Sequence, residues 1–173
     1  YTIHSDGSID VSIKSNAQGD MPQWLPRIGL QWQLPEQYEK ITWYGRGPFE
    51  TYPDRKTGAK MDVHTSTVSE EYVPYLIPQD YGNKSDVYWV EMANDSGTGL
   101  RFESHKAFNI SAHPYSTEKL ERAMYPFQLQ DEEVIYLNID PEITGVGDTS
   151  KSTLTKYRVM PGIYSFTFTM IPM

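Results

Sequence analysis

Apolar and polar residues alternate along most of the chain, the pattern of strands that bury one face of a sheet. The first such segment carries Ile9, Val11 and Ile13, and a second runs from 28 to 34. Further short alternating stretches lie at 41–43, 87–92, 100–102, 108–112, 135–139 and 164–170. This pattern predicts an all-β fold of antiparallel strands in two packed sheets with long connections.

A turn-forming sequence at 94–99 separates two of these strands and predicts a hairpin. In its first strand, strict alternation places Tyr88 on the face of Val90 and Met92, opposite to Trp89. Aromatic residues make up 13% of the chain, which suits half-buried pleated surfaces.

One stretch, near 117–124, is typical of a short helix. Ser116 or Thr117 can cap its start, Leu120 and Met124 fall on one face, and Pro126 closes it.

The segment from 48 to 82 shows no clear period and is predicted to be a long loop. A loop of that length in a compact domain is usually functional or packed against other parts. Since there is no repeat or linker, we expect a single domain over 1–173.

Charge and composition narrow the classes of partner. The chain has 15 Lys and Arg against 23 Asp and Glu, a net charge of −8, which disfavours nucleic acid and anionic membranes. It has no cysteine, so disulfides and thiolate metal sites are excluded. No apolar run approaches the roughly 18 residues of a membrane span. The first residue is Tyr1 rather than Met, so we expect a fragment, either processed or cut.

The loop 43–55 concentrates charged and aromatic residues. Arg46 and Arg55 can each bind a carboxylate through two hydrogen bonds, and Glu50 and Asp54 are the acids nearest in sequence. Two interpretations stay open: a loop held together by Arg–carboxylate pairs, or a loop that contacts sugar.

Other candidate chemistry is sparse. The four histidines (His4, His64, His105 and His113) form no metal-binding pattern, and we predict no metal site. His64, placed in the long loop, ranks first if one histidine acts. The glycine-rich stretch 145–151 opens no helix and is therefore no phosphate loop; it is either a polar loop that reaches a ligand or an ordinary exposed turn. Glycosidic chemistry needs two carboxyl groups about 5–10 Å apart, and no pair is evident.

The same motifs, in the same order, resemble the C-terminal "small chain" domain of glycoside hydrolase family 2 β-galactosidases. The resemblance starts at Leu25-Pro26-Arg27-Ile28-Gly29-Leu30 and centres on Trp43-Tyr44-Gly45-Arg46-Gly47-Pro48 with Tyr52-Pro53-Asp54-Arg55. It continues through Tyr81-Gly82-Asn83, Phe108-Asn109-Ile110-Ser111, Leu137-Asn138-Ile139-Asp140 and Gly145-Val146-Gly147.

The resemblance implies a galactose-mutarotase-like antiparallel β-supersandwich and a non-catalytic role. In that family both catalytic glutamates lie in a separate barrel domain, where one protonates the glycosidic oxygen and the other forms a covalent intermediate. The small chain would wall the sugar pocket and aid assembly, and its partners would be the remaining domains, a galactoside and further copies of itself. No cofactor is expected in this chain, although the family often uses Mg and Na in other domains. Both cytoplasm and periplasm stay open as compartments.

One departure bears on specificity. Family members carry a tryptophan platform after Gly-Val-Gly, whereas here the loop is shorter and Lys151 falls at or near that place. The predicted substrate-binding residues are Asp148, Thr149, Ser150 and Lys151, with Arg46 and His64.

Two alternatives stay open. A free-standing carbohydrate-binding module would need an exposed aromatic platform with a sugar-sized groove. An aldose epimerase of the same fold would need His paired with Glu or Asp.

Overall fold

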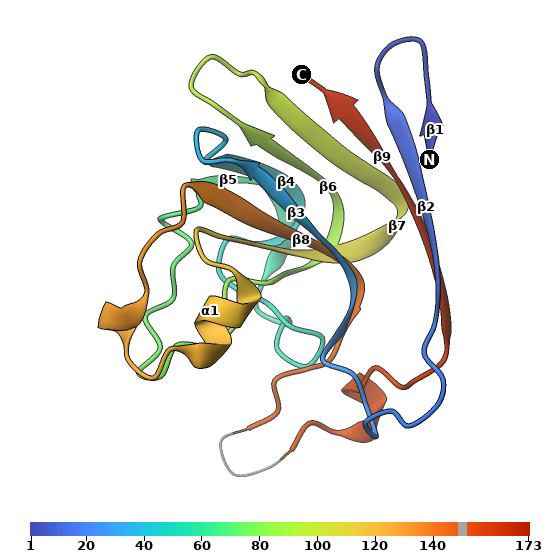
Figure 1. Cartoon of the computed structure of the whole chain (residues 1–173), viewed down its shortest axis with the longest axis vertical. Helices are drawn as coiled ribbons and strands as arrows, with labels where there is room; N and C mark the ends of the chain where they lie inside the picture. The colour runs from blue at the N-terminus through green and yellow to red at the C-terminus, as the bar shows by residue number, and fades with distance from the viewer. Residues whose placement is uncertain (149–151) are drawn as a thin grey trace.

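A computed structural model describes residues 1–148 and 152–173, which form an all-β fold with one short α-helix (Figure 1). The nine strands of this described part are β1 (Thr2–Ile3), β2 (Ile9–Asn16), β3 (Arg27–Pro35), β4 (Lys40–Gly47), β5 (Lys60–Thr67), β6 (Lys84–Ala93), β7 (Gly99–His113), β8 (Val134–Ile143) and β9 (Ile163–Pro172). The helix is α1 (Thr117–Arg122), and short 3-10 turns lie at Pro126–Gln128 and Thr155–Tyr157. The predicted fold class is confirmed.

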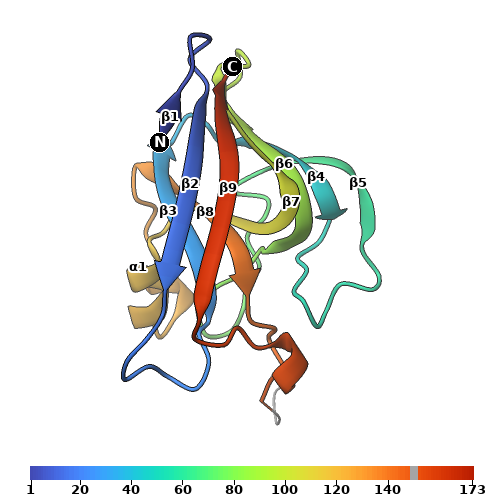
Figure 2. The ribbon, with the colours of Figure 1, turned by 90° about the vertical axis from the view of Figure 1, so that its right-hand side faces the viewer.

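All strand pairs are antiparallel, and seven strands lie in the order β1-β2-β9-β7-β6-β4-β5. The pair β3–β8 joins this sheet through β7. The first part of β7, Leu100–Glu103, pairs with β9, whereas Asn109–His113 pair with β8. Strand β7 therefore belongs to both layers; β9 lies beside β2 in Figure 2.

The core fills the space between these layers. Its largest members include Trp43, Phe102, Phe108 and Phe168, each at most 1% exposed. Trp32 from β3 packs on Phe102 and Phe168 with ring centroids 5.7 and 6.2 Å away, which joins the β3–β8 pair to the large sheet. Burial of each such ring contributes about 1.5–3 kcal/mol.

The prediction that 48–82 is one long loop is wrong, because β5 (Lys60–Thr67) lies inside it. Strand β5 is the last in the sheet order and pairs only with β4 among the described strands. Most of its side chains are exposed on both faces, and so no alternation marks it in the sequence.

The predicted placement of Tyr88 is also wrong. The register between β6 and β7 shifts at Val87 and again before Trp89. This irregularity lets both Val87 and Val90 be fully buried, while Tyr88 stays 40% exposed.

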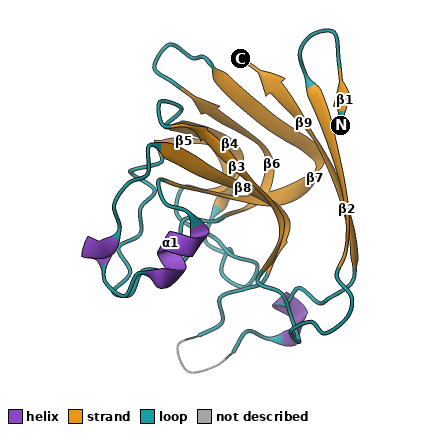
Figure 3. Cartoon of the chain, in the orientation of Figure 1, coloured by secondary structure: helices purple, strands orange, loops and turns teal. Residues whose placement is uncertain are grey.

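The predicted short helix exists but is shorter than expected. Ser116 caps α1 by accepting a bond from the Lys119 N–H, and Leu120 is buried beneath it. Met124 lies beyond the helix end and is 60% exposed, contrary to the expected shared face. In Figure 3, α1 lies beside the loops at one end of the sheet.

Candidate functional site

The loop after β4 is held by Glu50. Its carboxylate accepts hydrogen bonds from the Arg55 guanidinium and the Tyr75 hydroxyl, and from the Gly82 N–H at 2.9 Å. The expected Arg–carboxylate pair is therefore confirmed for Arg55. It ties residues 50–55 to the segment that precedes β6.

Thr51 fixes the same loop from within the core. It is fully buried, and its hydroxyl accepts a bond from the Ser85 N–H at 2.8 Å. The Asn83 side-chain amide donates to the Thr51 carbonyl at 2.7 Å. The loop backbone is thus bonded to the start of β6.

The hydrogen bonds of Arg46 all go to other parts of the protein. Its Nε donates to Asp86 at 2.5 Å and its Nη1 to the Ala59 carbonyl at 3.0 Å. Lys56 binds the same Asp86 carboxylate at 2.7 Å. Burial opposes ionisation of Asp86, but the bonds from Lys56 and Arg46 outweigh it and hold its pKa below the ordinary value. The geometry gives Arg46 a bracing role, and its contact with substrate stays a prediction.

His64 lies on strand β5, not in a loop as predicted, because β5 interrupts that loop. It sits opposite Trp43, with ring centroids 5.2 Å apart. A Cβ on Gly47 would lie 2.7 Å from its ring, so Gly47 lets the imidazole pack on the β4 backbone. Its Nε2 lies 3.3 Å from the Lys60 carbonyl.

Asp54 joins the loop after β4 to the glycine-rich stretch after β8. Its two carboxylate oxygens accept bonds from the backbone N–H groups of Val146, at 3.0 Å, and Gly147, at 2.8 Å. A Cβ on Gly145 would lie 2.4 Å from the Asp54 carboxyl carbon, so only glycine fits there. The Gly-Val-Gly motif is therefore shaped to hold a carboxylate.

The far side of this stretch is bonded too. Thr153 donates to the Gly145 carbonyl at 2.6 Å, and the Arg158 Nε donates to the Thr153 carbonyl at 2.7 Å. Arg158 also lies over the Trp24 ring at 4.3 Å, a cation–π contact. Residues 145–148 are thus oriented from two directions.

Of the four loop residues predicted to bind substrate, the structure describes only Asp148. Asp148 is exposed and follows Gly147, which Asp54 holds. Thr149, Ser150 and Lys151 lie outside the described residues. The structure brings neither Arg46 nor His64 into hydrogen-bond contact with Asp54, since their described bonds lie within the β4–β6 region.

A charged cluster around the buried Asp140 was missed by sequence reasoning. Arg27 binds Asp80 at 2.6 Å and Asp140 at 3.2 Å. Burial raises the pKa of Asp140 to about 7, against the opposing effect of Arg27. The sequence feature that could have indicated this cluster is Gly29, because Asp140 packs against its backbone. A Cβ added at Gly29 would lie 2.0 Å from the Asp140 Oδ1.

The described residues form neither a metal-binding cluster nor a membrane-spanning helix. Across residues 1–148 and 152–173, no group of three or more His, Asp or Glu side chains is arranged to hold a metal ion. No helix in the same residues is long and apolar enough to span a bilayer.

Comparison with known proteins gives a consistent result. A family model described as "Beta galactosidase small chain" matches residues 1–170. A β-galactosidase of Priestia megaterium is 34% identical over 100% of this chain, which corresponds to 17% of that relative. The β-galactosidase BgaC of Bifidobacterium adolescentis is 38% identical over 81% of the chain and 13% of its own length. One of Pseudoalteromonas haloplanktis is 33% identical over 98% and 16%.

The chain thus spans about one sixth of the curated relatives that it matches. The range matched by the family model, residues 1–170, includes both the loop after β4 and residues 145–148. The chain belongs to the β-galactosidase small-chain family.

Proposed function

We propose that this chain is the non-catalytic small-chain domain of a larger β-galactosidase, an enzyme that removes terminal β-D-galactose. The observation that carries the proposal is the pattern of coverage: the match takes in all of this chain but only 17% of the Priestia megaterium relative. The catalytic carboxylates, and the Mg and Na that the family often uses, would then lie in other parts of the larger enzyme.

The state of the local carboxylates supports a non-catalytic role. Glu50 accepts from Arg55, Asp86 from Arg46 and Lys56, and Asp54 from two backbone N–H groups. The oxygens of these three carboxylates are thus engaged by donors within the protein, whereas a catalytic acid or base must reach the proton that it transfers on the substrate.

Burial raises the pKa of Asp140 to about 7, a value suited to proton transfer. Its side chain is 2% exposed and bonded to Arg27, so a substrate does not reach it. We assign Asp140 to the framework.

Three of the four histidines, His4, His64 and His113, give the epimerase alternative little support. His113 is buried and bonds the Tyr81 carbonyl through Nε2 at 2.8 Å, while His64 bonds the Lys60 carbonyl. His4 pairs with Asp10 at 2.9 Å on the surface, far along the sheet at β2. An epimerase needs a His and a carboxylate converging on one substrate.

We infer that residues 145–148 form the pocket-facing part of the domain, with Asp54 as their positioning residue. Thr149, Ser150 and Lys151 stay predicted substrate-binding residues, and Arg46 and His64 would support the loop after β4. The domain would act by shaping the sugar pocket and by contacts with the rest of the enzyme and with further copies.

A chromogenic β-galactoside assay tests whether hydrolysis needs the parts of the larger enzyme outside this chain. The 173-residue chain alone should give no turnover, and the larger enzyme should be active. Turnover by the chain alone, abolished by replacing a local carboxylate, would overturn the proposal.

The role of Asp54 is tested in the larger enzyme. Asp54→Ala removes two charge-assisted hydrogen bonds, each of about 1–3 kcal/mol, so KM should rise by about tenfold or more while the protein stays folded. Glu36→Ala is the matched control, since this exposed acid lies in the turn after β3. An unchanged KM for Asp54→Ala would refute the positioning role.

A further inference from the structure

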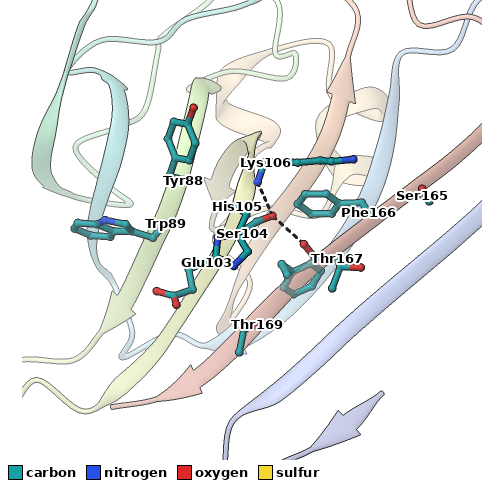
Figure 4. A pocket seen from close by; sticks show the side chains of 11 residues that line it. Tyr88, Trp89, Glu103, Ser104, His105, Lys106, Ser165, Phe166, Thr167 and Thr169 are labelled. Carbon is teal, nitrogen blue, oxygen red and sulfur yellow. Dashed lines mark hydrogen bonds between the residues drawn. The ribbon is translucent and has the colours of Figure 1, made fainter.

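A groove of about 450 Å³ lies where β7 separates from β9 (Figure 4). The two strands pair as far as Glu103 and Thr169, after which β7 turns toward β8 and pairs with it from Asn109. The volume falls within the range of about 300–1,000 Å³ that is usual for small-molecule sites. This groove is distinct from the loops at 48–55 and 145–148.

Aromatic side chains from β6 line one side of the groove. Figure 4 shows Tyr88 and Trp89 on β6, with Lys106 and Phe166 on the other side of the opening. Tyr88 reaches this surface because of the register shift in β6, and it is 40% exposed. The Arg101 guanidinium lies 4.2 Å from the Trp89 ring centroid and steadies the indole. Exposed rings offer a flat apolar surface on which the C–H face of a sugar ring can pack.

The β9 side of the groove carries unpaired backbone groups. Within the described strands, Ser165 and Thr167 pair only with β2. The Ser104 hydroxyl donates to the Thr167 carbonyl at 2.8 Å, so this carbonyl faces the groove. In an antiparallel strand the N–H and C=O of one residue point the same way, and residues two apart agree. The Thr167 N–H and both backbone groups of Ser165 therefore face the groove as well.

The charges at the rim balance. Glu103 bonds Arg101 at 2.8 Å and keeps a side chain that is 42% exposed. Lys106 is exposed, and none of the described carboxylates forms an ion pair with it. The lining thus carries one carboxylate (Glu103), one ammonium group (Lys106) and one imidazole (His105), which suits a neutral ligand with many hydroxyl groups better than a polyanion.

An added β-strand fits the groove less well than a small ligand. The Ser104 hydroxyl already occupies the Thr167 carbonyl, and the pairing of Glu103 with Thr169 closes one end. An extended peptide therefore finds no continuous edge to pair with.

We propose that this groove is a saccharide-binding subsite for a neutral pyranoside, which stacks on Tyr88 and hydrogen-bonds to the exposed backbone of Ser165 and Thr167. The site goes beyond the proposed function, since it neither uses the loop at 145–148 nor depends on hydrolysis.

The test is an NMR titration of the 173-residue chain with methyl β-galactopyranoside, methyl β-glucopyranoside and lactose. Saturable shifts should be confined to residues 88–89, 103–106 and 165–169. Tyr88→Ala should weaken binding about tenfold, whereas Tyr88→Phe should retain it. Tyr44→Ala is the matched control, because Tyr44 lies 6.0 Å from the Tyr88 ring and is 38% exposed, yet it does not line the groove.

Three results would overturn the proposal. The first is the absence of shifts at about 50 mM sugar, well above a Kd of about 1 mM. The second is a set of shifts that maps to residues 145–148, which would support the pocket loop instead. The third is equal weakening by Tyr44→Ala and Tyr88→Ala.

Discussion

Replacing Thr51 by Val tests whether the loop after β4 is fixed by a buried hydrogen bond. The side chains are similar in size, but Val cannot accept the bond that the Ser85 N–H donates at 2.8 Å. Thr51 is fully buried and Ser85 is 1% exposed, so water does not replace the lost acceptor. A buried donor left without a partner costs about 1–3 kcal/mol.

With a loss of about 2 kcal/mol, Tm should fall by about 4–8 °C, since a domain of this size loses about 2–4 °C per kcal/mol. Urea unfolding gives the free energy directly, and amide exchange of Ser85 should accelerate in the variant. Thr42→Val is the control: its hydroxyl meets that of Thr65 at 3.2 Å on an accessible face, and we expect a change within about 0.5 kcal/mol.

The reasoning is refuted if Thr51→Val unfolds within about 0.5 kcal/mol of the unchanged chain. It is refuted equally if Thr42→Val loses as much stability. In either case the loop would owe its position to Glu50 and the surrounding packing rather than to this bond.

Three further predictions concern the framework. The raised pKa of Asp140, about 7, means that the folded chain holds this proton more tightly than the unfolded chain; its contribution to stability is full below about pH 4 and is lost as pH rises through about 7. Urea unfolding at about pH 5 and about pH 8 should therefore show a smaller loss on alkalinisation for Asp140→Asn. The difference has a ceiling of about 2.7 kcal/mol, because about two pKa units of 1.36 kcal/mol each lie between pH 5 and the pKa of about 7, and equal losses in both chains would contradict this. Strand β5 lies at the edge of the sheet and its Val63 is 54% exposed, so the chain should self-associate in sedimentation velocity experiments. Val63→Lys should weaken this association. The control Val146→Lys changes a 49% exposed valine outside the sheet and should leave the association unchanged. Gly29→Ala should cost about 1–3 kcal/mol or prevent folding, because its Cβ would lie 2.5 Å from the Ile139 carbonyl, whereas Gly58→Ala, with its nearest atom at 3.7 Å, should be tolerated; equal stability of the two variants would count against the close approach.

Alternation was sufficient to predict most strands, because apolar residues gather on one face of each; in β8 both faces are buried, but Asn138 and Asp140 keep the second face polar. It failed at β5, which is exposed on both faces, and at Tyr88, where an irregular register moves one residue to the other face. The strands were therefore predicted from the alternation of apolar and polar residues, which reflects burial, rather than from the strand propensity of individual residues.

The site was predictable only where partners are close in sequence. Arg55 and Glu50 are five residues apart, and their pair was among the interpretations drawn from the sequence. Asp54 and Val146 are separated by 92 residues, and Arg46 and Asp86 by 40. Such pairs depend on how β4, β6 and β8 are arranged, which periodicity does not specify.

The position of β9 has a consequence for how the chain is made. This strand, near residue 170, inserts between β2, near residue 10, and β7. During synthesis both neighbours must therefore keep open edges until β9 has left the ribosome. Contacts of such long sequence separation fold slowly, and unpaired edges invite association with other chains. The demand for a chaperone should be greatest just before β9 emerges.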